Sequence, residues 1–224
     1  MSRVLAAFSV AAVTLGMVSA PMAQADPATC PPDCDTIPPA AWIAPAVIPL
    51  DAEYHWPTLS PLAVVQQRPR FYFEDQCAGS PTPNDPRAYA VAARATVTRP
   101  PGEWQLQAQV LHWRGDTWLG GQLADEVVRS AAAALRACQL TAPHVSPTVT
   151  TEEPGKLAAV LTVAGTPTTV VHQYLMAHPQ SSSVVELAMW STSPPADNWP
   201  AIPDGRMLDA MMAPLCEAYI ASCR

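Results

Sequence analysis

The sequence predicts an α+β domain: an antiparallel β-sheet packed by one long inserted helix and a C-terminal helix, and stapled by disulfides. Three observations lead to this expectation. Short segments of alternating apolar and polar residues follow one another with short connections, as neighbouring antiparallel strands do. One long segment between them, and another near residue 210, have the helical spacing of apolar residues. The 224 residues include six cysteines, an even number that suits disulfide pairing.

The first two predicted strands form a hairpin. Residues 89–98 alternate in polarity up to a turn at 99–102, and residues 104–110 alternate again. The apolar positions of the second segment are Trp104, Leu106, Ala108 and Val110. Its other face carries Gln105, Gln107 and Gln109. Amides at every second position predict a strand with one solvent-facing side.

The long helix is predicted from Leu119 to Cys138, where apolar residues recur at steps of four and three. Asp125 stands four residues before Arg129 on the opposite side, a spacing that supports a helical ion pair. Asp116 precedes the first turn and is expected to cap it.

Three further strands are predicted at 157–163, 168–177 and 184–190. A four-residue loop at 179–182 would set the apolar face of the last strand beside His172 and its neighbours. A five-residue loop would instead bring together His172, Glu186 and Trp190, a group with acid/base potential. The first register is preferred because it places apolar faces side by side. In this register His172 is half-buried and has a structural role.

The last helix is predicted from Asp204, as its N-cap, towards Ile220. Its methionines are interpreted as core residues, although a methionine cluster can also form a binding groove. Pro214 lies inside the pattern, so we expect a kink or two short helices.

The N-terminal residues 1–25 predict a cleaved signal peptide. Residues 4–20 carry no charge, and Ala23-Gln24-Ala25 has the small residues of a cleavage site. The alternative is a retained membrane anchor, because 17 residues reach about 25 Å as a helix. Gly16 and Pro21 interrupt that helix and favour cleavage. The mature chain is then extracytoplasmic, without stable membrane insertion.

Residues 26–61 form a predicted proline-rich arm, followed by a single domain at 62–224. The arm carries nine prolines, which exclude a long helix or a central strand. Its many apolar side chains predict that it lies along the domain. The alternative, a flexible tether, would favour a polar Ser/Gly/Thr composition.

The cysteines are expected to form disulfides in an oxidising compartment. They stand at Cys30, Cys34, Cys77, Cys138, Cys216 and Cys223. Six cysteines allow fifteen pairings, and we favour those that contain a Cys77–Cys138 bridge, which closes a loop of about 60 residues. The other four cysteines are then expected to pair among themselves. A zinc site at Cys30 and Cys34 is the alternative, but the histidines show no ligand-like spacing.

Several function classes find no support in the sequence. A net charge of −7 with one lysine leaves no basic surface for nucleic acid. No nucleophile elbow, zinc-protease, phosphate-loop or dinucleotide motif occurs. We therefore predict no catalytic residue, cofactor or metal.

One turn offers a candidate binding surface. Arg114-Gly115-Asp116 has the charge pattern with which adhesion ligands bind integrins. The alternative is a structural role, in which Gly115 adopts a positive φ and Asp116 caps the helix that follows. Trp113 and Trp118 flank the turn and could stack on sugars or lipids.

The alanine-, arginine- and proline-rich composition, Ala23-Gln24-Ala25 and the mature start Asp26-Pro27-Ala28 resemble small exported proteins of mycobacteria and related actinobacteria. The element order over 62–223, with Cys77 and Cys138 far apart, is similar to the extracellular sensor domains of mycobacterial receptor kinases of the PknH type. This resemblance implies an antiparallel sheet flanked by helices and a cleft for an unidentified ligand. The chain has no second hydrophobic span and no kinase domain, so no site residue is carried over.

Together these observations predict a secreted, non-catalytic cell-envelope protein that binds a small ligand, a lipid, a glycan or a protein partner. A hydrolase that uses His172 and Glu186 is one alternative. A surface adhesin that uses Arg114 to Asp116 is another.

Overall fold

The computed structural model describes residues 34–79, 83–219 and 222–223, so the predicted signal peptide and Cys30 lie outside the described residues. All seven strands form one antiparallel sheet in the order β1-β2-β3-β7-β6-β5-β4. The strands are β1 (Val64–Val65), β2 (Val91–Val97), β3 (Gln105–His112), β4 (Val145–Glu153), β5 (Lys156–Val163), β6 (Thr169–His178) and β7 (Ser183–Thr192). The α-helices are α1 (Asp51–Tyr54), α2 (Tyr72–Gln76), α3 (Thr117–Thr141) and α4 (Asp204–Ala218). Short 3-10 turns are η1 (Pro39–Ala41), η2 (Pro45–Val47), η3 (Ser60–Leu62), η4 (Pro86–Tyr89) and η5 (Pro179–Ser181).

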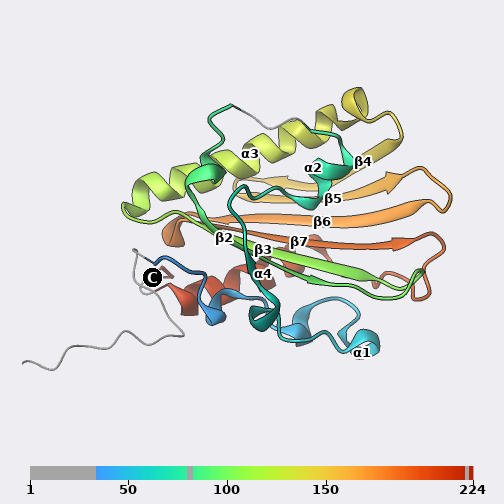
Figure 1. Cartoon of the computed structure of the whole chain (residues 1–224), viewed down its shortest axis with the longest axis horizontal. Coiled ribbons are helices and arrows are strands. Elements are labelled where there is room, and N and C mark those ends of the chain that lie inside the picture. The colour runs from blue at the N-terminus through green and yellow to red at the C-terminus, as the bar shows by residue number, and fades with distance from the viewer. Residues whose placement is uncertain (1–33, 80–82, 220–221, 224) are drawn as a thin grey trace, which may run out of the picture.

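The sheet lies between two helical layers, which confirms the predicted α+β class. Helix α3 runs along one side of the sheet and α4 along the other (Figure 1). Each side has its own apolar core, because alternate residues of every strand point to opposite faces. The α3 side buries Val127, Ala131 and Leu135 of the predicted helical stripe.

The register of β6 and β7 is the predicted apolar one. His172 lies opposite Met189, Tyr174 opposite Leu187, and Met176 opposite Val185. These side chains share the α4 face, and His172 is half-buried as expected. The turn η5 therefore closes the hairpin in the register that keeps apolar residues inside.

The prediction that one side of β3 faces solvent is wrong. Gln107 and Gln109 are buried, with 6% and 0% of their surface exposed. The segment that leads into α2 lies over this face, and the backbone carbonyl of Arg70 accepts a hydrogen bond from Gln109 Nε2 at 3.3 Å. The amides can be buried because a backbone segment covers them and offers them hydrogen-bond partners.

From residue 34 on, the proline-rich arm packs against the domain. Trp42, Ile43, Tyr54 and Trp56 are buried in the core on the α4 side. Trp56 Nε1 donates to the carbonyl of Pro49 at 2.8 Å, so the indole has a partner although it is buried.

The N-cap of α4 differs from the prediction, and of the two alternatives expected at Pro214 the structure excludes two short helices. Asp204 is the first helical residue, Pro203 is the N-cap, and the Asp204 carboxylate accepts a hydrogen bond from Thr151 Oγ1 at 2.8 Å. The segment is one helix that continues through Pro214, not two short ones. Met211 and Leu215 are fully buried on either side of this proline, and their burial offsets its cost of about 3 kcal/mol. Met207 and Met211 are core residues, as predicted.

Two disulfides lie within the described residues. Cys77–Cys138 confirms the preferred pairing and joins the end of α2 to α3. Cys216–Cys223 links α4 to the residues that follow it, and Cys34 is also disulfide-bonded. Among the described helices, none is both long and apolar enough to cross a membrane.

Candidate functional site

The candidate turn at 114–116 is exposed, and its charges already have partners in the protein. Arg114 forms an ion pair with Asp35. Asp116 accepts a hydrogen bond from the Leu119 N–H at 2.7 Å and caps α3, as predicted. Gly115 has a φ of 89°, the conformation that glycine adopts without strain. A structural role therefore accounts for this turn.

The two tryptophans beside the turn lie in different environments. Trp113 is buried, and its Nε1 donates to the carbonyl of Pro86 at 3.0 Å. Trp118 is 72% exposed near the start of α3. Only Trp118 of this pair has the surface needed to stack on a ligand.

The structure does not bring His172 and Glu186 together, because they lie on opposite faces of the sheet. His172 stacks on Trp199 with ring centroids 3.7 Å apart. Burial lowers the pKa of His172 to about 4, although the charge of Asp204 opposes this effect. The imidazole is therefore neutral at pH 7 and is part of an aromatic cluster rather than an acid/base group.

Glu186 is the centre of a buried polar network on the α3 side. Its carboxylate accepts hydrogen bonds from the backbone N–H of Tyr72 and from the side-chain amides of Gln107 and Gln173, the latter two at 3.1 Å. Burial raises the pKa of Glu186 to about 7, although these hydrogen bonds act in the opposite direction. Since the group is completely enclosed, it positions the chain and does not face a ligand.

A hollow of about 390 Å³ lies beside the edge strand β1, a size that suits a small ligand. The segments 68–70 and 84–89 line it. Gln66 N–H donates to the Ala92 carbonyl and continues the β1–β2 pairing, which brings Arg68 towards Tyr89 at the same edge.

Arginines dominate the charge of this hollow. Arg68, Arg70 and Arg87 line it together with a single carboxylate, Asp85. Burial alone would lower the pKa of Arg87, but the hydrogen bonds that it donates to the carboxylates of Asp85 and Glu74 raise it, so this guanidinium stays charged. Burial alone would raise the pKa of Asp85, yet the bonds from Arg87 lower it. The charge of Arg87 is thus neutralised locally, whereas Arg68 is exposed at the rim.

Apolar side chains surround the same edge. Tyr89, which lines the hollow, is 73% exposed, and on the adjoining strand Val64 and Val65 are 63% and 70% exposed. Leu62, just before β1, is 42% exposed. Exposed apolar residues that gather beside a cationic hollow are typical of a binding surface.

Two other hollows have a similar volume but a different charge. One of about 380 Å³ is lined by Asp125, Glu152 and Glu153 as well as by Arg129 and Lys156, and ion pairs engage both Glu152 and Lys156. The other, about 420 Å³, lies between the arm and α4. Its charged lining is Asp51, Glu53 and Arg206. Of these three hollows, only the one beside β1 is lined by more basic than acidic residues, and of its arginines Arg70 and Arg87 form ion pairs with neighbouring carboxylates.

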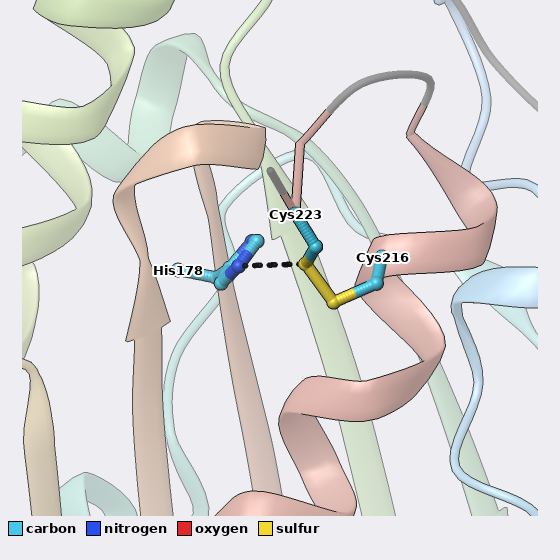
Figure 2. A group of neighbouring side chains, drawn as sticks. All are labelled: His178, Cys216 and Cys223. Atoms are coloured by element: carbon cyan, nitrogen blue, oxygen red, sulfur yellow. Dashed lines mark hydrogen bonds between the residues drawn. A yellow bond between two sulfur atoms is a disulfide. The ribbon is translucent and has the colours of Figure 1, made fainter.

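A second cluster lies where β6 ends against the end of α4. Figure 2 shows the imidazole of His178 directed at the Cys216–Cys223 disulfide, with Nε2 3.4 Å from Cys223 Sγ. His178 is buried, Cys216 half-buried and Cys223 exposed. Burial lowers the pKa of His178, so the ring is neutral at pH 7. The ligand atoms of the three residues lie within 4.8 Å of one another.

Sequence reasoning missed both sites. The arginine hollow combines two segments that are separated in the chain, and no motif marks either of them. The His178 cluster carries a partial signal, because His178 ends the strand face that His172 shares and Cys216 lies near the end of the predicted C-terminal helix. No protein-family model matches the chain, and no curated protein is significantly similar to it.

Proposed function

We propose that this protein is a secreted, non-catalytic domain of the cell envelope that binds an amphiphile with an anionic group and an apolar portion. The observation that carries this proposal is the arginine hollow beside β1 with its exposed apolar rim. The net charge of the chain is −7, so a local excess of guanidinium groups runs against its overall charge. The two disulfides support an extracytoplasmic location.

The arrangement favours an anionic head group at Arg68 and Arg70. Arginine donates in a planar fork that matches carboxylate and phosphate oxygens. Arg70 is held in place because its Nη2 donates to the carbonyls of Gly79 at 2.8 Å and Glu74 at 3.2 Å, and its Nε forms an ion pair with Asp75 at 3.0 Å, which leaves Nη1 for a ligand. Arg68 is exposed and can turn towards a ligand. One guanidinium is thus preorganised and the other adaptable.

The apolar portion of the ligand would lie along Tyr89 and β1. Covering the exposed faces of Tyr89 and Val64, whose strand partner Arg94 donates to the Arg70 carbonyl, removes apolar surface from water, which favours binding by about 25 cal/mol per Å². The described residues that line the hollow include no histidine, cysteine or serine to act as a base or nucleophile. Its chemistry therefore supports binding and not catalysis.

Calorimetric titration tests this proposal with decyl phosphate below its micelle concentration, and with decyl maltoside as the neutral counterpart. We expect decyl phosphate to bind with one-to-one stoichiometry and decyl maltoside to bind at least tenfold more weakly. Arg68→Ser and Tyr89→Ser should each weaken decyl phosphate binding about tenfold, the equivalent of about 1.4 kcal/mol.

Arg136→Ser is the matched control, because this exposed arginine lies on α3 and does not line the hollow. It removes the same charge and should leave affinity unchanged. Absence of decyl phosphate binding, or an equal loss in Arg136→Ser and Arg68→Ser, would show that the hollow is not the binding site.

A further inference from the structure

The His178 cluster has a hydrogen-bond arrangement that determines which nitrogen of the ring carries the proton. Ser181 Oγ donates to the carbonyl of His178 at 3.2 Å and lies 2.8 Å from His178 Nδ1. The hydroxyl proton is engaged by the carbonyl, so Oγ accepts from an Nδ1–H. The ring is then the Nδ1–H tautomer, and the lone pair of Nε2 is directed at Cys223 Sγ.

This lone pair suits a reduced or metal-bound sulfur better than a disulfide. A disulfide sulfur has no proton to donate, and Nε2 in this tautomer has none either. A Cys223 thiol could donate to Nε2, and a metal ion could accept a lone pair from both atoms. A second partner on the far ring nitrogen is the usual arrangement of a histidine ligand, and Ser181 supplies it here.

We propose that reduction of the Cys216–Cys223 disulfide converts these two cysteines and His178 into a three-ligand site for a d10 metal ion, with Zn²⁺ as the representative case. Two thiolates and one imidazole are ligands that zinc prefers. With bonds of about 2.3 Å to sulfur and about 2.0 Å to nitrogen, a tetrahedral centre places these atoms about 3.5 Å apart. The distance from His178 Nε2 to Cys223 Sγ is 3.4 Å.

The bridge is accessible to a reductant, unlike the other described disulfide. Cys223 is exposed, whereas Cys77 and Cys138 are 3% and 0% exposed. A dithiol delivers two electrons and two protons, breaks the S–S bond and is itself oxidised to a disulfide. The two thiols then release their protons as two metal–sulfur bonds form, while His178 binds through its Nε2 lone pair without losing a proton.

The test uses the full mature chain treated with dithiothreitol. Alkylation and peptide mass mapping identify the conditions in which Cys216 and Cys223 are reduced while Cys77–Cys138 stays intact. After the reductant is removed without oxygen, Co²⁺ is added and then displaced by Zn²⁺. We expect one equivalent of Co²⁺ with a sulfur-to-cobalt charge-transfer band in the reduced protein, and no such band in the oxidised protein.

Variants of His178 and of its hydrogen-bond partner Ser181 identify the third ligand. His178→Ala should lower Zn²⁺ affinity at least tenfold, and Ser181→Ala should lower it by about tenfold because the ring loses its orienting partner. His144→Ala, at an exposed position just before β4, is the matched control and should bind as the unaltered protein does.

Three outcomes would overturn the proposal. One is the lack of a charge-transfer band in the reduced protein, and another is unchanged Zn²⁺ affinity in His178→Ala. The third is loss of the near-ultraviolet circular dichroism signal when this bridge alone is reduced, because the ligand set requires the folded contact between β6 and α4.

Discussion

Glu186 makes the stability of this fold dependent on pH in a defined direction. Burial raises its pKa from 4.5 to about 7. The folded state therefore holds this proton more tightly than the unfolded chain does. The stabilising contribution of the protonated group is fully present below about pH 4.5 and is lost as the pH rises through about 7. At about 1.4 kcal/mol per pH unit, the loss amounts to about 3 kcal/mol of unfolding free energy.

Glu186→Gln isolates this contribution, because the amide has a similar shape and does not ionise. Urea unfolding followed by tryptophan fluorescence gives the unfolding free energy of both proteins from about pH 4 to about pH 9. The advantage of the unaltered protein over the variant should shrink by about 3 kcal/mol across this range. Glu217→Gln, at an exposed position of α4, should give no such trend. A constant difference between Glu186→Gln and the unaltered protein would refute the argument.

Two further predictions concern the packing at Gly121 and the ion pairs of Arg87. Gly121→Ala adds a Cβ atom 2.8 Å from the Pro179 carbonyl oxygen, so α3 must move away from η5 and stability should fall by about 1–3 kcal/mol in urea unfolding. Gly205→Ala, with nothing within 4 Å of the added atom, should not destabilise, and an equal effect of both changes would contradict the packing argument. Arg87→Met removes two ion pairs of 2.6 Å, leaves two carboxylates largely shielded from water, and should cost about 3 kcal/mol. Thermal unfolding should show this as a decrease of about 6–12 °C in Tm, and an unchanged Tm would contradict it.

Five of the strands and the register of β6 and β7 could be predicted because both depend on side-chain alternation, whereas β1 and β4 were not predicted. His172, Tyr174 and Met176 can be buried together only if Met189, Leu187 and Val185 lie beside them. A shift by one residue would place the charge of Glu186 in that apolar layer, so the preference for one register is strong. Local pattern was sufficient here because both partners belong to one hairpin.

The environment of β3 could not be predicted in this way, since an alternation of polar residues does not identify what covers them. Gln107 and Gln109 would suit water equally well. Their burial depends on α2, which lies about thirty residues earlier in the chain and has no apolar stripe that predicts its position. Only the tertiary arrangement places the Arg70 carbonyl over Gln109.

The His178 cluster required information of the same long-range kind. The sequence indicates that His178 ends a strand face and that Cys216 lies near the end of a helix, but not that the two ends coincide. They meet because α4 lies across β6 and β7 on the face that carries His172. The crossing position follows from the packing of Met207, Met211 and Leu215 against the sheet. Small changes in that packing would separate the imidazole from the sulfur without altering either sequence pattern.

The buried polar face of β3 and β7 also explains how the arginine hollow is built. Glu186 accepts from the backbone N–H of Tyr72, while Arg94 and Gln109 both donate to the carbonyl of Arg70. These bonds attach the segment at 70–72 to the sheet by its backbone and leave its arginine side chain directed outward to the hollow. An apolar face would bury more hydrophobic surface but would leave those backbone groups without partners. The glutamines and Glu186 therefore hold the segment that carries Arg70, and the polar network and the hollow are parts of one arrangement.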